Sequence, residues 1–371
     1  MTRREFTRGA AGALLLAGVG IAPGCASTRG ELRPRSAEPL GPPLGPEEER
    51  ILAHAALAPS GHNTQPWVVR IVERRRWIVG VDPERRLPAV DPVNRELALS
   101  MGAFVENLAV AANASGLVAE VEVLSAARDA AALVALRLVE AASADEHGLE
   151  RIRLRRTVRK GYRSERILPD DLKTITAPYG AGAAWFPTGS REARWLAKAE
   201  LEAFRKQARR DDAQGELARW IRFSDDDVER HRDGLTPATM EVGALASLYM
   251  RHFMGRDAVM TKSFRDAGID GTAKQVSEGA GWLVVTSPDE TVSALLDTGR
   301  RFEQMALRLR ERRLAAHPMS QLLEEEPFRS EVAKELALAA APQFLLRVGY
   351  VAEYPSPVSP RRPPRAFART A

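Results

Sequence analysis

The chain has 371 residues, of which 44% are hydrophobic and 28% are charged, so its composition is that of a globular protein with one large or two ordinary domains. The formal net charge of +5 falls to +3 once the +2 of the first eight residues is subtracted, which is too little to predict nucleic-acid binding. Cys25 is the only cysteine, which excludes an internal disulfide, and the six histidines lack metal-ligand spacing. We therefore predict no metal site and no nucleic-acid partner.

The N-terminus carries the pattern of an export signal. Arg3 and Arg4 are followed by Phe6 and then by an uncharged run over residues 9–22. The run has fourteen residues, fewer than the ~20 that a bilayer-spanning helix needs, so it is typical of a signal peptide. We predict that residues 1–25 are a twin-arginine signal peptide. The protein would then be periplasmic, or anchored on the outer side of the inner membrane.

Cys25 closes the signal region and follows Ala-Pro-Gly, which resembles a lipoprotein cleavage box. Lipidation of Cys25 is therefore one prediction, and cleavage after a small residue such as Ala26 is the alternative. A lipid anchor would be the only membrane contact that the sequence predicts. Residues 26–45 are rich in proline, glycine and charge, so we interpret them as a flexible linker.

Helical and strand-like patterns are interspersed beyond the linker. Helices are predicted at 46–58, 98–115 and 290–315, and strands at 67–72, 77–81, 119–124, 131–139, 281–286 and 343–351. The region from 163 to 276 is predicted to be rich in helix, and charge runs mark 190–275 as an insertion. This mixture predicts an α+β fold in which helices pack on sheets.

The loop after the first helix concentrates polar and turn-forming residues. It reads Ala58-Pro59-Ser60-Gly61-His62-Asn63-Thr64-Gln65-Pro66-Trp67, and Pro59 ends the helix. Ser60, Asn63 and Gln65 offer a hydroxyl and two carboxamides, with Trp67 as a wall, which suits a polar, planar or phosphorylated ligand. His62 either faces that ligand or is structural. The same residue types also make an ordinary turn, and this alternative stays open.

Two arginine-containing segments are candidates for holding a phosphate. They read Arg155-Arg156-Thr157-Val158-Arg159 and Ser359-Pro360-Arg361-Arg362-Pro363. Guanidinium forks and a hydroxyl donor suit a phosphate group. Arginine is so common in this chain that a single arginine is weak evidence, and the second segment also fits a disordered tail.

Taken together, these motifs resemble the nitroreductase family of FMN oxidoreductases. The pattern Pro-Ser-x-x-Asn-x-Gln-Pro-Trp at 59–67 is similar to the family's flavin-contacting loop, and Arg155-x-Thr157-x-Arg159 is similar to its phosphate motif, with Thr in place of Ser. The segment at 359–363 resembles the family's closing basic motif, which also reaches the phosphate, and Arg361 matches its register better than Arg362. The resemblance implies an FMN cofactor held by the site residues Ser60, His62, Asn63, Gln65, Arg155, Arg156, Thr157, Arg159, Arg361 and Arg362. In ordinary members the arginine motif comes before the loop, whereas here it follows about a hundred residues later.

An internal repeat accounts for the unusual order. Gly102-Ala-Phe-Val-Glu-Asn-Leu-Ala-Val110 matches Gly299-Arg-Arg-Phe-Glu-Gln-Met-Ala-Leu307 at an offset of 197 residues, and Leu117 falls on Leu314. We interpret residues 46–150 and 151–371 as two tandem halves that pack as an intramolecular pseudo-dimer. This arrangement resembles the Acg branch of the family and implies a lid-like insertion. Its apolar residues Met240, Leu248, Tyr249, Met250, Phe253 and Met254 would cover the flavin or simply pack between helices.

The resemblance implies an exported oxidoreductase that transfers two electrons through FMN to a small electron-poor acceptor, of nitroaromatic or quinone class. Because both half-sites lie in one chain, a monomer would bind FMN. The electron donor stays unidentified, since NAD(P)H is not expected outside the cytoplasm. The alternative is a non-catalytic protein that binds or sequesters flavin.

Overall fold

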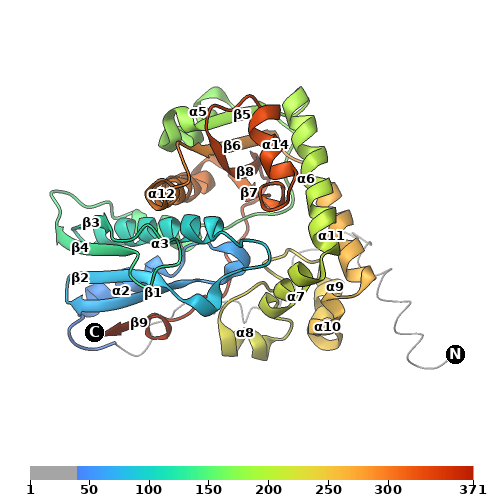
Figure 1. Cartoon of the computed structure of the whole chain (residues 1–371). Coiled ribbons are helices and arrows are strands. Elements are labelled where there is room, and N and C mark those ends of the chain that lie inside the picture. The colour runs from blue at the N-terminus through green and yellow to red at the C-terminus, as the bar shows by residue number, and fades with distance from the viewer. Residues whose placement is uncertain (1–39, 371) are drawn as a thin grey trace.

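The computed structural model describes residues 40–370, so the predicted signal peptide, Cys25 and most of the linker lie outside the described residues. Within this range, none of the helices combines the length and apolar character that crossing a membrane requires. The described chain is a mixed α+β structure with two sheets, and two long helices, α3 and α12, lie between them (Figure 1). The α+β prediction is confirmed.

The first sheet has five strands in the order β3-β4-β2-β1-β9. Its members are β1 (Trp67–Glu73), β2 (Arg76–Val81), β3 (Leu117–Val123), β4 (Val134–Glu140) and β9 (Ala368–Thr370). Neighbours are antiparallel except β9, which runs parallel to β1 with Ala368 opposite Val69. Trp67, Val69 and Ile71 alternate with more exposed residues along β1, so one face of the strand packs on the core.

The second sheet has four antiparallel strands in the order β5-β6-β8-β7. Its members are β5 (Ala183–Pro187), β6 (Gly281–Ser287), β7 (Leu314–Pro318) and β8 (Ala341–Tyr350). Read from the β7 edge, the order β7-β8-β6-β5 is the same as β3-β4-β2-β1 in the first sheet. The two sheets therefore share one topology, and β9 is an additional strand on the first.

The elements before each sheet also correspond. Helix α2 (Pro46–Ala55) and turn η1 (Gly61–Asn63) precede β1, while α5 (Pro169–Thr176) and turn η3 (Ala177–Gly182) precede β5. Both helices begin with proline and carry acidic residues in the first turn, which suits a helix N-terminus. The residues that follow read Ala58-Pro59-Ser60-Gly61 in the first case and Ala177-Pro178-Tyr179-Gly180 in the second. Tyr179 is only 3% exposed and packs in the core of the second sheet.

Helices α3 (Arg95–Asn113) and α12 (Val292–Leu309) cross at two glycines. A Cβ on Gly102 would lie 2.2 Å from the Leu296 carbonyl oxygen, and a Cβ on Gly299 would lie 2.0 Å from that of Leu99. Glycine at both positions lets the two backbones approach this closely. The Thr291 hydroxyl caps α12 by accepting from the Ala294 N–H at 3.3 Å.

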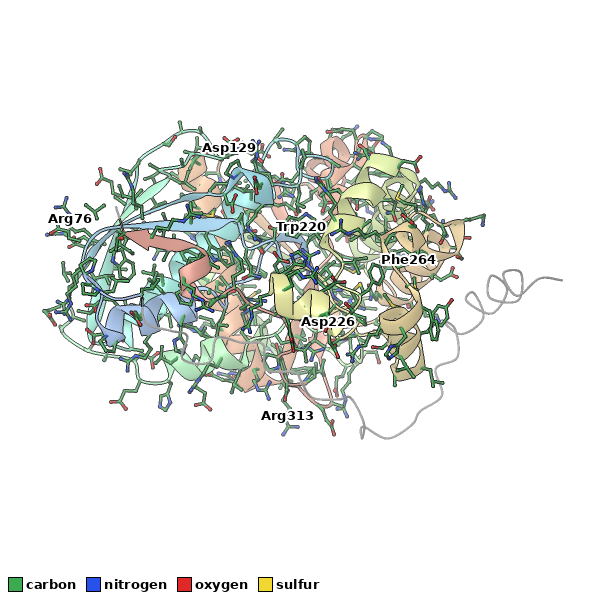
Figure 2. All side chains as sticks on the ribbon, turned by 90° about the horizontal axis from the view of Figure 1, so that it is seen from below. Arg76, Asp129, Trp220, Asp226, Phe264 and Arg313 are labelled. Carbon is green, nitrogen blue, oxygen red and sulfur yellow. The ribbon has the colours of Figure 1, made fainter. Side chains whose placement is uncertain are left out.

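Six helices separate β5 from β6 along the chain. They are α6 (Arg191–Arg209), α7 (Asp211–Trp220), α8 (Asp225–His231), α9 (Ala244–Phe253), α10 (Arg256–Val259) and α11 (Lys262–Gln275). Ile221, Phe223, Met250 and Val259 belong to a separate small core in this region. Trp220 packs with Leu87 and Val90, which lie between β2 and α3, and it lies near the middle of the molecule (Figure 2). The remaining elements are α4 (Gly148–Leu154), α13 (Gln321–Glu324), α14 (Phe328–Glu335) and the turns η2 (Pro83–Arg85), η4 (Arg310–Arg312) and η5 (Pro364–Ala366).

The region from 163 to 276 is rich in helix, as predicted, but it also contains strand β5, whose Ala183-Ala184 start gives no alternating pattern. One expectation about local structure was wrong. The helix predicted to reach residue 315 ends at Leu309, because Arg313 adopts a positive φ of 53° and Leu314 begins β7. Leu314 and Leu117 therefore each begin a strand after the corresponding helix.

Candidate functional site

A cavity of about 90 Å³ lies where four segments that are far apart in the sequence meet. The loop after α2, the arginine segment before α5, the insertion and the C-terminal segment all contribute to its wall. The lining residues are Pro59, Ser60, His62, Asn63, Arg155, Arg156, Thr157, Arg159, Leu235, Thr239, Pro357, Val358, Ser359 and Arg361. Gln65 and Arg362, which the sequence also predicted, do not line it. Segments that are about a hundred and about three hundred residues apart thus converge on one site.

The loop at 59–67 is shaped by unusual backbone conformations. His62, Asn63 and Gln65 all have positive φ, of 48°, 54° and 53°. Such angles are uncommon for residues other than glycine and cluster at functional sites. The Ser60 hydroxyl accepts from the Gln65 N–H at 2.9 Å and closes the loop on itself. The backbone therefore presents the Ser60, His62 and Asn63 side chains to the cavity.

Trp67 does not form the wall that the sequence predicted. It is fully buried as the first residue of β1 and stacks on Phe104 with ring centroids 4.7 Å apart. A large aromatic side chain at this inward position of the strand contributes more as core than as a ligand surface. The sequence pattern identified the residue type but not the face on which it lies.

Gln65 is fully buried and its carboxamide binds other parts of the protein. Its Nε2 donates to the Arg232 carbonyl at 3.0 Å, and its Oε1 accepts from the Arg362 N–H at 2.9 Å. The Arg362 guanidinium in turn donates to the carbonyls of Gln65 and Trp67 at 2.6 and 3.0 Å. Burial lowers the pKa of Arg362 to about 10. These two residues hold the C-terminal segment against the loop.

Arg361 lies next to Arg362 but reaches the cavity. It is 4% exposed and donates from Nη1 to Asn63 Oδ1 at 2.8 Å. Asn63 Nδ2 donates to the Gly234 carbonyl at 3.0 Å and to the Pro360 carbonyl at 3.2 Å. The tail is thus ordered around Arg361, which excludes the alternative of a disordered end for this segment. Asn63 links the loop, the tail and the insertion at one point.

Arg155 enters the cavity wall from the end of α4 and is backed by a buried carboxylate. Its Nε lies 3.2 Å from Glu303 Oε1, and the Glu303 side chain is fully buried. With the Asn107 amide oriented so that its nitrogen faces Glu303, that nitrogen donates to Oε1 at 3.0 Å, and the Asn107 oxygen accepts from the Ala58 N–H at 3.0 Å. Burial raises the pKa of Glu303 to about 7, while Arg155 and Arg361 oppose the rise.

Arg156 and Arg159 meet the insertion at Glu241. The Glu241 carboxylate accepts from Arg156 Nη2 at 2.9 Å and from the Arg159 N–H at 3.0 Å. Arg159 Nε donates to the Thr239 carbonyl at 3.1 Å, and Lys160 Nζ donates to the Glu241 carbonyl at 2.6 Å. Glu241 itself has a positive φ of 55°. The insertion therefore bridges the site, because its residues 232–234 contact the loop and its residues 239–241 contact the arginine segment.

Two histidines near these cations are neutral at pH 7. Burial lowers the pKa of His62 to about 4, with nearby Glu96 opposing the change and Arg159 adding to it. Burial also lowers the pKa of His317 well below its usual value, helped by Arg159 and Arg347. His317 Nε2 lies 2.6 Å from Arg159 Nη1, so the neutral ring accepts a hydrogen bond there. The positive charge around the cavity consequently comes from the arginines.

The apolar insertion residues that the sequence offered as a cover do not line the cavity. Met250 is buried in the insertion's own core, while Leu248 and Phe253 are 55% and 75% exposed. From the insertion, Leu235 and Thr239 line the cavity instead. They precede α9, in a segment whose sequence shows no motif. Glu303 was visible in the sequence only as part of the repeat, and Glu241 gave no sequence signal.

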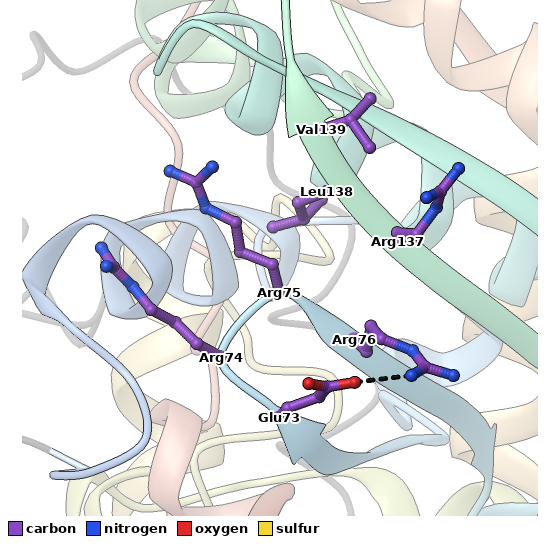
Figure 3. A pocket seen from close by; sticks show the side chains of 7 residues that line it. All are labelled: Glu73, Arg74, Arg75, Arg76, Arg137, Leu138 and Val139. Carbon is purple, nitrogen blue, oxygen red and sulfur yellow. Dashed lines mark hydrogen bonds and ion pairs between the residues drawn. The ribbon is translucent and has the colours of Figure 1, made fainter.

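A second, open depression of about 540 Å³ lies at the turn between β1 and β2 (Figure 3). Four arginines line it, but each is paired with a carboxylate: Arg74 with Glu48, Arg75 with Glu140, Arg76 with Glu73, and Arg137 with Glu120. Figure 2 shows Arg76 at the outer edge of the molecule. The charge is locally balanced, so this depression is not an anion site. Across residues 40–370 no group of three or more potential ligands is placed to hold a metal ion.

Comparison with known proteins shows similarity to a curated protein and to solved structures. No protein-family model matches the chain. It is 25% identical over 307 residues to PigM of Serratia sp., named an NAD(P)H nitroreductase, and the alignment covers 80% of this chain and 86% of PigM. The FMN-dependent nitroreductase NfnB of Mycobacterium smegmatis matches with a TM-score of 0.40 and 15% identity over 61% of this chain and 98% of NfnB. An NADH dehydrogenase/NAD(P)H nitroreductase of Parabacteroides distasonis matches with a TM-score of 0.30 and 17% identity over 56% of this chain and 89% of its own. This chain is thus similar in sequence, over most of its length, to an NAD(P)H nitroreductase.

Proposed function

We propose that this chain is an exported FMN-dependent oxidoreductase of nitroreductase type, which reduces an electron-poor acceptor, such as a nitroaromatic or a quinone, by two electrons. The observation that carries the proposal is the convergence of the 59–63 loop, the 155–159 segment and Arg361 on one cavity. These are the segments whose residues resemble the flavin-contacting motifs. The similarity to PigM supports the same class of activity.

The wall residues fit FMN by their chemistry. Arg155, Arg159 and Arg361, with the Thr157 hydroxyl, would hold the phosphate, because guanidinium forks and hydroxyls bind phosphate well. Ser60 and Asn63 would bind the ribityl chain and the pyrimidine edge. When bound, FMN supplies hydride-transfer chemistry, and nearby cations favour its reduced, anionic form.

The size of the cavity adds a condition to the proposal. Its volume of about 90 Å³ is well below the ~300–1,000 Å³ of typical ligand sites. FMN would therefore enter only if part of the wall withdraws. The segment at 235–241 is the candidate, because it covers the cavity and contacts Arg156 and Arg159 through one residue, Glu241, and one carbonyl, that of Thr239. The insertion would then act as a lid.

The architecture would be an Acg-like pseudo-dimer within one chain. Three observations support this: the shared strand order of the two sheets, the facing glycines at the helix crossing, and reciprocal contacts across it. Glu106 accepts from Gln304 at 3.0 Å, and Glu303 accepts from Asn107 at 3.0 Å, as the two copies of one interface would. Tyr179 takes the position of Ser60 in the second half, so one flavin site per chain is expected.

Export by the twin-arginine route, with or without lipidation of Cys25, is the part of the proposal that rests on residues 1–25 alone. That route carries folded proteins, which suits a chain that must acquire its cofactor in the cytoplasm. The name of PigM gives NAD(P)H as its donor. An exported protein would be separated from NAD(P)H, so the donor for this chain would be a different reductant.

A flavin-sequestering protein without turnover is the second candidate function. The specific observation in its favour is that the insertion contacts the cavity wall on two sides. Arg232 and Gly234 bond the loop, and Glu241 bonds the arginine segment. A flavin retained under such a cover would be shielded from acceptors.

Purification of the full chain from the cytoplasm tests the proposal. We expect the protein to copurify with FMN, and not FAD, at about one per chain in a monomeric peak on sizing chromatography. Bleaching of the flavin absorbance by candidate donors, followed by recovery on adding a quinone or nitroaromatic, would distinguish the oxidoreductase from the sequestering protein. A colourless protein that also fails to take up added FMN would exclude both.

A further inference from the structure

Glu303 is a fully buried carboxylate that belongs to no catalytic motif, yet it touches both halves of the candidate site. It lies on α12, and its Oε1 is 3.2 Å from Arg155 Nε and 3.0 Å from the Asn107 amide nitrogen. Its Oε2 has no hydrogen-bond partner among the described residues. Burying a carboxylate with incomplete hydrogen bonding is unfavourable, so such groups are retained mainly where they have a function.

The contacts of Glu303 lead directly to the cavity wall on two sides. Arg155 lines the cavity, and its Nε forms an ion pair with Glu303 Oε1 at 3.2 Å without making a hydrogen bond to it. Asn107 accepts from the Ala58 N–H, and Ala58 precedes Pro59, the first wall residue of the loop. One carboxylate therefore connects the arginine segment of the second half to the loop of the first half.

We propose that Glu303 is the positioning residue of this site, which aims Arg155 at the phosphate of the cofactor and fixes the start of the 59–67 loop through Asn107. This inference rests on the proposed FMN site. Glu303 acts through the reach of its side chain, which forms the ion pair with Arg155 and accepts the hydrogen bond from Asn107, since its negative charge by itself would weaken the binding of an anion. The burial that raises its pKa to about 7 also means that loss of the charge costs the folded protein little near neutral pH.

Glu106 offers a matched control at the same interface. It occupies the corresponding position in α3, is 6% exposed, and accepts from Arg300 Nε at 2.9 Å and Gln304 Nε2 at 3.0 Å. Neither partner lines the cavity. A substitution at Glu106 therefore disturbs the packing of α3 on α12 in a similar way without changing the aim of Arg155.

The test compares FMN with riboflavin, which lacks the phosphate, in the full-length chain. Dissociation constants for both would be measured by fluorescence titration for the wild type, Glu303→Ala, Glu303→Asp, Glu303→Gln and Glu106→Ala. We expect Ala and Asp at position 303 to lower the preference for FMN over riboflavin about tenfold, which corresponds to about 1.4 kcal/mol, because Arg155 would no longer be held toward the phosphate. Asp keeps the charge but is too short, whereas Gln keeps the reach and should restore the wild-type preference.

Each outcome of this comparison either supports or overturns the positioning role of Glu303. An unchanged preference in Glu303→Asp, or an equal loss in Glu106→Ala, overturns the positioning role while leaving the FMN site intact. A loss in Glu303→Gln with retention in Glu303→Asp shows that charge and not reach is what matters, and also overturns it. Wild-type protein that binds neither flavin refutes the proposed function itself, and the inference with it. Should Glu303→Ala fail to fold, the Asp and Gln pair still decides.

Discussion

Replacing Gly102 or Gly299 by alanine should destabilise the chain strongly, because each new methyl group would meet backbone and not a movable side chain. The added Cβ at Gly102 would be 2.2 Å from the Leu296 carbonyl oxygen, and at Gly299 it would be 2.0 Å from the Leu99 carbonyl oxygen. Ordinary van der Waals contacts of a Cβ lie at 3.4–4 Å, and Cβ atoms essentially never approach another heavy atom more closely than 3.0 Å. Helices α3 and α12 would have to separate by roughly 1 Å in a close-packed interior.

The magnitude follows from that separation. Overpacking a core usually costs ~1–3 kcal/mol, and a backbone clash that no rotamer change relieves belongs at or above the upper end, about 3 kcal/mol. The two glycines also face each other, since the Cβ on Gly102 would lie 3.0 Å from the Gly299 Cα. Once one alanine has separated the helices, the second should cost much less, so the double variant should be clearly non-additive.

Gly215 provides a control in which alanine should raise the free energy of unfolding. It lies inside α7, and a Cβ there would meet nothing within 4 Å. Alanine at an open helical position should stabilise the chain by ~0.5–1 kcal/mol, because glycine loses more backbone freedom on folding.

Urea unfolding followed by circular dichroism and by tryptophan fluorescence measures all four variants. We expect lower midpoints for Gly102→Ala and Gly299→Ala and a slightly higher midpoint for Gly215→Ala, with similar slopes. Wild-type midpoints for both interface variants would refute the close crossing of α3 and α12, and with it the support that this crossing gives to a pseudo-dimer.

Three further predictions concern single charged residues. Arg155→Ala or Arg159→Ala should weaken FMN binding about ten- to a hundredfold, because a hydrogen bond between an arginine and a phosphate is worth ~1.5–3 kcal/mol. Arg209→Ala, at the end of α6, should leave the affinity unchanged. Equal losses of affinity in all three variants, measured by titration, would contradict the assignment of Arg155 and Arg159 to the phosphate site. Glu241→Gln should speed FMN release about fivefold, as expected for losing an interaction of ~1 kcal/mol, and an unchanged rate in a stopped-flow displacement experiment would argue against a lid. Burial raises the pKa of Glu200 from 4.5 to about 8, so the folded chain retains a proton that the unfolded chain releases, and stability should fall as the pH rises between these values and level off above them. Glu200→Gln should flatten that dependence in thermal melts at pH 5 and pH 8, and a slope as steep as in the wild type would show that other groups cause it.

Local patterns in the sequence predicted most elements and the segments that build the cavity. Helix α3 and strands β1, β2, β6 and β8 lie close to their predicted ranges, because amphipathic and alternating patterns are set by neighbouring residues. Strand β5 was missed because it is short and its partner β6 follows only after the insertion. Because the two sheets share one topology, a strand that corresponds to β1 has to precede β6. The internal repeat could therefore have predicted β5, whereas the local sequence pattern could not.

The individual site residues were harder to predict than the segments that carry them. Gln65 and Arg362 have the right residue types, but each satisfies buried backbone groups of the other's segment. Which polar side chain faces a cavity and which one supports the backbone depends on the positive φ angles of the loop. Contacts across the insertion, such as that of Glu241, depend on tertiary packing and left no pattern in the sequence.

The parallel pairing of β9 with β1 sets the order of events during synthesis. Val69 pairs with Ala368, so the outer edge of the first sheet stays open while almost three hundred residues are still being translated. Ser359 and Arg361, which lie on the way to β9, reach the cavity only at the same late stage. The nascent chain therefore exposes the unpaired edge of β1 until the last residues are translated, and it has to avoid aggregation through that edge. The chain can therefore bind its ligand only after translation is complete. A truncated chain that leaves the ribosome before residue 361 is translated would lack one wall of the cavity.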